Sequence, residues 1–201
     1  MIGIINYGLG NVRAFVNVYN QLDIPCCLVS SPNELDGLSH IILPGVGSFD
    51  FAMEALERCE LVDALHHAVC VEKKPILGVC VGMQIMARGS EEGRKAGLGW
   101  LDTQVNKIAS SALLPVPHMG WNRVQQIGPS PVFEGIKQGS EFYFLHSFGF
   151  VADQNGVVAT AKYVDEIGVV IHRSNIIGIQ CHPEKSHSPG IRFLENFARC
   201  C

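Results

Sequence analysis

The chain has 201 residues, of which 47% are hydrophobic and 17% charged, and its formal net charge is −4. These values indicate one globular domain with a large core and exclude a disordered or fibrous protein. The longest basic run is Lys73-Lys74, so we expect neither a nucleic-acid surface nor a polybasic membrane patch. No apolar stretch approaches the length of about 18 residues that a transmembrane helix needs. The apolar start lacks the basic region of a signal peptide and predicts a buried strand.

Eight cysteines are scattered along the chain, two pairs of them adjacent (Cys26-Cys27 and Cys200-Cys201), and none forms a C-x-x-C motif. This pattern gives little support to a thiolate metal site. We therefore expect no metal, no cofactor, and a reducing cytoplasmic environment with mostly buried or idle thiols.

The first 90 residues alternate short apolar runs with helical patterns, which is typical of a parallel sheet with crossover helices. The expected strands are Ile2–Asn6, Cys26–Val29, Ile41–Leu43 and Pro75–Val79. The expected helices are Val12–Leu22, Phe51–Val71 with a break near Cys59-Glu60, and one whose first part is Gly82–Ala87.

From about Gly97 short β-rich runs are separated by turn residues, which predicts antiparallel additions to the sheet. These runs are Gln104–Ile108, Phe142–Phe150, Val157–Tyr163, Gly168–His172 and Ile176–Gln180, and a helix over Gly190–Cys201 follows them. The predicted fold is α/β: a single domain over residues 1–201 with a mixed, mostly parallel central sheet flanked by helices.

The strongest chemical signal is Gly78-Val79-Cys80-Val81-Gly82, between a predicted strand and a predicted helix. This is a G-x-nucleophile-x-G elbow with cysteine as the nucleophile. Small flanking residues let a sharp turn lift the sulfur to the edge of the sheet, and the N–H of Val81 is a natural oxyanion donor. A buried cysteine on a tight turn is an equal alternative for this pattern alone.

A thiolate nucleophile needs a base and a group that orients the base. His182-Pro183-Glu184 follows the strand expected at Ile176–Gln180, so imidazole and carboxylate can share one rim of the sheet. The motif is weak by itself, because any loop can contain it.

Two further segments are candidates for the same edge. Pro44-Gly45-Val46-Gly47 follows a strand and exposes backbone N–H groups; a phosphate loop is the alternative, but the lysine of that motif is missing. Tyr143–Ser147 ends another strand and is mostly a core segment by its composition.

Together these motifs resemble the class I, triad-type glutamine amidotransferases, on Gly78–Gln84 and His182–Glu184. Four segments narrow the resemblance to the glutaminase subunits of imidazole glycerol phosphate synthase, in histidine biosynthesis. They are Asn6–Asn11, Pro44–Phe49, Pro117-His118-Met119-Gly120-Trp121-Asn122, which discriminates best, and His182–Ser186.

The resemblance implies that Cys80 attacks the carboxamide of glutamine, with His182 as base and Glu184 as its orienting acid. It implies oxyanion donors at Val81 and in the loop at Val46 and Gly47. It implies a substrate pocket formed by Gly45, Gln84, His146, Ser147 and Phe148.

The family also implies a heterodimer in which ammonia passes to a (β/α)₈ cyclase subunit. A glutaminase that uses all 201 residues leaves nothing to bind an acceptor, which independently favours a partner. The candidate interface residues are Asn11, His118, Met119, Trp121 and Lys185; Met119 and Trp121 packing inward is the alternative. Cys181 departs from the family, which usually has an aromatic residue there, and most simply fills core volume.

Three other functions stay open. The chain could supply ammonia to surface-polysaccharide sugar synthesis, could be a non-catalytic subunit of the same fold, or could be a cysteine hydrolase or peptidase. The complete set of Cys80, His182 and Glu184 argues against a non-catalytic subunit, and Gln84 with the Gly45 loop favours a small amide substrate.

Overall fold

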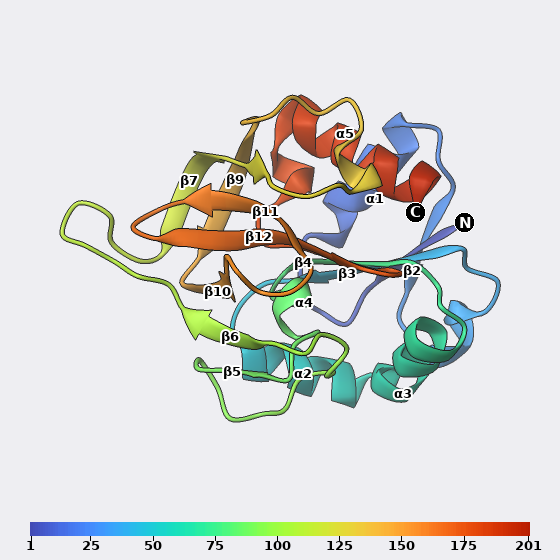
Figure 1. Ribbon diagram of the computed structural model, residues 1–201. Helices are drawn as coiled ribbons and strands as arrows, with labels where there is room; N and C mark the ends of the chain where they lie inside the picture. The colour runs from blue at the N-terminus through green and yellow to red at the C-terminus, as the bar shows by residue number, and fades with distance from the viewer.

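Residues 2–80 build the parallel half of an eleven-stranded sheet (Figure 1). The computed structural model describes residues 1–201, apart from the side chain of Cys200. Strands β1 (Ile2–Ile5), β2 (Cys26–Val29), β3 (His40–Gly45) and β4 (Ile76–Cys80) lie in the order β2-β1-β3-β4, and all are parallel. Strands β1 and β4 are buried along their whole length, as expected for parallel strands covered on both faces.

Helices cover both faces of this sheet. Figure 1 shows α1 (Val12–Gln21) and α5 (His187–Cys200) on one face and α2 (Phe49–Arg58) and α3 (Leu61–His66) on the other. The break between α2 and α3 is confirmed: Glu60 has a left-handed φ of 57° there. A π-helical turn (His67–Val71) and a 3₁₀ turn (Pro32–Leu35) complete the first half.

Later strands extend the sheet, and the prediction of antiparallel additions is confirmed with two exceptions. Strand β13 (Ile176–Ile179) pairs in parallel with β4 and antiparallel with β12 (Glu166–Arg173). The sheet then continues through β10 (Phe148–Val151), β6 (Gln104–Lys107) and β5 (Gly89–Ser90), and the pair β6–β5 is the second parallel exception. Strand β11 (Val157–Lys162) joins β12 to β8 (Gln125–Gln126). The parallel β13 matters most, because it brings the residues that follow it to the edge where β4 ends.

A separate two-stranded ribbon, β7 (His118–Arg123) with β9 (Glu141–His146), was not predicted as such. The apolar residues of β7, Met119 and Trp121, alternate with Gly120 and Asn122 but lie on its exposed face, so the sequence offers no buried apolar face from which to expect this strand. The expected run Phe142–Phe150 is divided at Ser147 because β9 pairs with β7 and β10 with the main sheet.

The helix after Cys80 is shorter than predicted: α4 spans only Val81–Gln84. It ends because the carbonyls of Ile85, Met86 and Ala87 accept hydrogen bonds from the 98–101 segment instead of continuing the helix. Two 3₁₀ turns, Pro131–Phe133 and Pro183–Lys185, precede α5. Among the described residues no helix is both long and apolar enough to cross a membrane.

Candidate active site

Cys80 occupies a strained turn at the carboxyl edge of the sheet. Its φ of 56° and ψ of −116° are rare for a residue with a side chain. The turn is possible because its neighbours are glycines: a Cβ at Gly82 would overlap the carbonyl of Leu43, and one at Gly78 would overlap Gly82. The elbow predicted from the sequence is therefore present, and the side chain of Cys80 is 3% exposed.

His182 and Glu184 meet at the same edge. His182 Nδ1 lies 2.9 Å from Glu184 Oε1, and both side chains are nearly buried. The backbone N–H of His182 donates to the carbonyl of Tyr143 at 2.9 Å, and this hydrogen bond fixes the turn at His182 against β9. Glu184 Oε2 has no hydrogen-bond partner, the only such buried side-chain oxygen or nitrogen among the described residues.

The charge state of His182 follows from its neighbours. Burial opposes a positive charge on the imidazole, but hydrogen bonds and attraction to Cys80 and Glu184 outweigh burial and raise the pKa of His182 to about 9. A positively charged imidazole beside the Cys80 sulfur is the arrangement by which a base activates a cysteine nucleophile.

The loop after β3 faces this sulfur. Gly45 pairs in register with Cys80, and Val46 and Gly47 follow, the latter with a φ of 91°. The buried hydroxyl of Tyr7 donates to the carbonyl of Pro44 at 2.7 Å and so anchors the end of β3, from which the loop starts. The Val81 N–H lies in the first turn of α4, where backbone donors have no acceptor within the helix.

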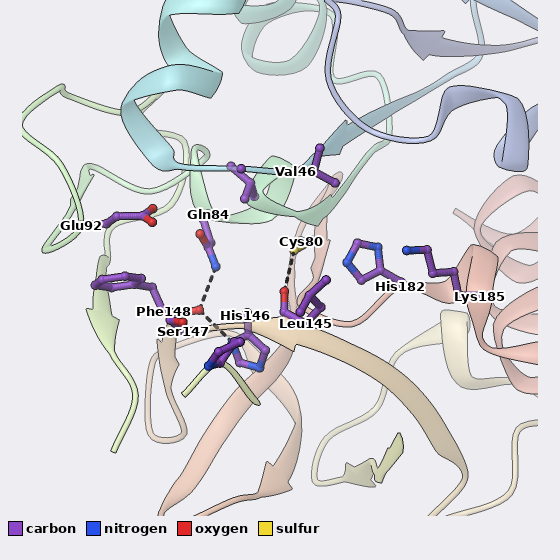
Figure 2. Close-up of a pocket in the computed structure, with 13 residues that line it drawn as sticks. Val46, Cys80, Gln84, Glu92, Leu145, His146, Ser147, Phe148, His182 and Lys185 are labelled. Carbon is purple, nitrogen blue, oxygen red and sulfur yellow. Dashed lines mark hydrogen bonds between the residues drawn. The ribbon is translucent and has the colours of Figure 1, made fainter. Parts of the chain in front are cut away.

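A cavity of about 220 Å³ opens above Cys80 (Figure 2). Most of the predicted pocket residues line it, and Gly45 does not, because it lies beneath, packed against the backbone of Gly82. The lining residues are Val46, Gly47, Cys80, Val81, Gln84, Glu92, Pro117, Leu145, His146, Ser147, Phe148, His182 and Lys185.

Sequence reasoning missed Glu92, which brings a carboxylate into the cavity wall. Glu92 Oε2 accepts from the N–H of Phe49 at 2.9 Å, at the start of α2. Its position depends on the irregular chain after α4, so no strand or helix pattern pointed to it.

The predicted interface residues separate into two groups. Met119 and Trp121 are 62% and 47% exposed, so the alternative that they pack inward is wrong. Lys185 and Asn11 are exposed too, and Asn11 also caps α1 by accepting from the N–H of Ala14. His118 is a correction: β7 alternates, so its side chain points inward and is 3% exposed, stacked against Phe144.

Cys181 is completely buried among apolar side chains, and burial raises the pKa of its thiol. A neutral, inaccessible thiol fits the expectation that it fills core volume.

Comparison with known proteins agrees with this geometry. The family model described as glutamine amidotransferase class-I matches residues 4–200. The imidazole glycerol phosphate synthase subunit HisH of Leptospira interrogans is 45% identical over 98% of this chain and 99% of its own length, and the same subunit of Bdellovibrio bacteriovorus is 43% identical over the same shares. A crystal structure of a glutamine amidotransferase has a TM-score of 0.74 and 20% identity, covering 98% of each chain; at this identity it supports the fold.

The chain therefore belongs to the class-I glutamine amidotransferases and, within that class, to the family of the HisH subunits of imidazole glycerol phosphate synthase. These relatives do not favour the polysaccharide alternative.

Proposed function

We propose that this chain hydrolyses glutamine through a thioester on Cys80 and passes the ammonia to a cyclase subunit of imidazole glycerol phosphate synthase. The observation that carries the proposal is the convergence of Cys80 and His182 in the wall of a cavity large enough for an amino acid, with Glu184 outside that wall and bonded to His182.

In the first step the Cys80 sulfur attacks the carboxamide carbon of glutamine. His182 takes the thiol proton and later gives a proton to the leaving nitrogen, so ammonia departs as the thioester forms. Glu184 holds the imidazole with Nδ1–H toward its own carboxylate, which leaves Nε2 for the sulfur.

The oxygen of the carboxamide becomes an oxyanion during this step. Its proposed donors are the N–H of Val81 and an N–H of the loop at Val46 and Gly47. Gly47 permits the loop peptide to turn, because a glycine is not restricted at positive φ.

The second step returns the enzyme to its starting state. Water, deprotonated by His182, attacks the thioester carbon, and glutamate leaves as Cys80 regains its proton. The amino-acid end of glutamine is proposed to lie against Gln84 and the 146–148 segment, with the carboxylate of Glu92 available for its ammonium group.

The proposed partner is a (β/α)₈ cyclase, which would use the ammonia to form imidazole glycerol phosphate and aminoimidazole carboxamide ribotide. Exposed Met119, Trp121, Lys185 and Asn11 are the proposed contacts. Free thiols at Cys26, Cys27, Cys59 and Cys70 support a reducing, cytoplasmic environment.

Glutamate release from glutamine, measured with and without the cognate cyclase, tests this function. Wild type is expected to release glutamate, faster with the cyclase, and Cys80→Ala to release none. Equal rates in the two proteins would overturn the role of Cys80, and a slow wild-type rate unchanged by the cyclase would overturn the partnership.

A further inference from the structure

The side-chain amide of Gln180 contacts the Cys80 sulfur. Strands β13 and β4 are parallel and in register at Ile179 and Val79, so the next residues along each, Gln180 and Cys80, lie side by side. Gln180 is completely buried, and its Nε2 donates to Cys80 Sγ at 3.6 Å. An amide N–H cannot take the proton of the thiol, so it can favour the thiolate without competing with His182.

The orientation of this amide is fixed by Gln84. Gln84 Nε2 donates to the carbonyl of Phe148 at 2.8 Å, and a carbonyl can only accept (Figure 2). The same nitrogen also donates to Gln180 Oε1 at 2.9 Å. Because Gln180 must present its oxygen to Gln84, it must present its NH₂ group to the sulfur.

Two histidines continue this line of hydrogen bonds, which runs from the Cys80 sulfur through Gln180, Gln84 and the Phe148 carbonyl, away from Cys80. His146 Nδ1 lies 2.9 Å from the same Phe148 carbonyl, and His146 Nε2 lies 3.0 Å from His118 Nδ1. His118 and His146 are partners across the β7–β9 ribbon, which explains their contact. His118 Nε2 in turn lies 3.2 Å from Asn122 Nδ2.

The donor and the acceptor of each hydrogen bond in this line can be assigned in only one way. Asn122 Nδ2 donates to the carbonyl of Lys162, so this atom is the amide nitrogen and His118 Nε2 must accept from it. His118 therefore carries its proton on Nδ1 and donates to His146, which carries its own on Nδ1 and donates to Phe148. Both rings are neutral: burial lowers the pKa of His118 to about 4 and that of His146 to about 3.

The far end of the line lies in β7, the strand that carries exposed Met119 and Trp121 on its opposite face. A partner that contacts Met119 and Trp121 can therefore shift or fix β7, the strand whose inner face carries His118. We propose that Gln180 and His118 are positioning residues for the glutaminase reaction. Gln180 orients the Cys80 sulfur, and His118 links the position of Gln180, through the hydrogen bonds described above, to the position of β7. The proposal rests on the proposed function and deepens it by naming how the docking strand reaches the nucleophile.

Alkylation of Cys80 by iodoacetamide tests the role of Gln180 and requires neither glutamine nor the cyclase. The rate is followed for the Cys80 peptide by mass spectrometry across pH 6–9. Gln180→Met removes the donor, and we expect alkylation at neutral pH to slow about tenfold, the equivalent of one hydrogen bond to a charged group. Gln180→Glu also removes the donor but keeps an acceptor for Gln84, and it should slow alkylation at least as much.

The matched control is Cys181→Ala, which alters the neighbouring buried side chain and should leave the Cys80 rate within about twofold. Wild-type rates in both Gln180 variants would overturn the role of Gln180, and so would an equal loss in Cys181→Ala.

Stimulation by the cyclase tests the role of His118. His118→Phe keeps a flat ring against Phe144 but removes both hydrogen bonds, and we expect the factor by which the cyclase raises kcat to fall about fivefold or more. His118→Gln again offers one acceptor and one donor and should restore most of that factor. His172→Phe is the control: this histidine bonds to Ser130 and Ser174 outside the line, so the factor should not change.

An unchanged factor in His118→Phe would overturn the role of His118, and an equal loss in His118→Phe and His118→Gln would assign the effect to packing alone. Failure of the proposed function has a different signature, namely no glutamate release by wild type with the cyclase. In that case the alkylation rates still decide whether Gln180 holds the sulfur.

Discussion

His182 and Glu184 are two residues apart, and the proline between them helps place the imidazole Nδ1 and the carboxylate Oε1 2.9 Å from each other. The 3₁₀ turn Pro183–Lys185 begins directly after His182, so one short segment supplies both the base and the group that orients it.

Glu184→Gln should therefore lower kcat for glutamine strongly, by about 10²- to 10⁴-fold, as when the acid of a triad becomes an amide and no longer fixes the tautomer of the histidine. KM should change little, because Glu184 does not line the cavity. Steady-state kinetics give both values. A variant whose defect lies in KM alone would show that Glu184 binds substrate instead.

Glu92→Gln should have the opposite signature. Removing the charge weakens the proposed contact with the ammonium group of glutamine, so we expect KM to rise about tenfold with kcat within about threefold. Glu91→Gln is the matched control, because the neighbouring Glu91 accepts from the N–H of Lys107 and is not part of the cavity wall. Equal effects of the two changes would contradict the role of Glu92.

Gly82→Ala should destabilise the fold as well as the site. The new methyl group would overlap the carbonyl of Leu43, so β3 or the elbow has to move, at a cost of about 2–4 kcal/mol in the free energy of unfolding. Gly128→Ala is the control, since a methyl there meets only ordinary contacts with Val158. Urea unfolding compares them; similar unfolding free energies in both variants would refute the tight packing of the elbow.

The pH dependence of stability should report the charged state of His182. Its pKa is raised from 6.5 to about 9 in the fold, so the fold gains stability that is fully present below about pH 6.5 and is lost as the pH rises through about 9. Cys80→Ser removes a main cause of this rise, so its unfolding free energy should fall less than that of wild type over the same window. Parallel curves for the two proteins would contradict a charged pair.

Much of the fold was predictable because its parallel half has a strong local pattern. Strands β1 to β4 are short apolar runs between turn residues, and the glycines on both sides of Cys80 indicate a turn too close for larger side chains. The ribbon β7–β9 was not predictable as a pair, since its register depends on contacts between distant segments. The interior position of His118 follows from that register and contradicts its predicted place at the interface.

The site was predicted to the extent that its residues belong to local motifs. Cys80, His182 and Glu184 each follow a recognisable strand. Glu92 and Gln180 were missed as site residues for different reasons: Glu92 lies in irregular chain, and Gln180 reads as the last residue of a buried strand. Only the parallel register of β13 with β4 shows that its side chain reaches the sulfur.

Labelling with a glutamine analogue that carries a diazoketone in place of the carboxamide tests the central claim most directly. The Cys80 thiolate should displace nitrogen from the protonated diazoketone and form a stable thioether, while excess glutamine should protect it. Mass spectrometry of the peptides is predicted to find the adduct on Cys80, and none there in Cys80→Ser. An adduct on another cysteine, or labelling of Cys80 that glutamine does not slow, would contradict Cys80 as the nucleophile of a glutamine site.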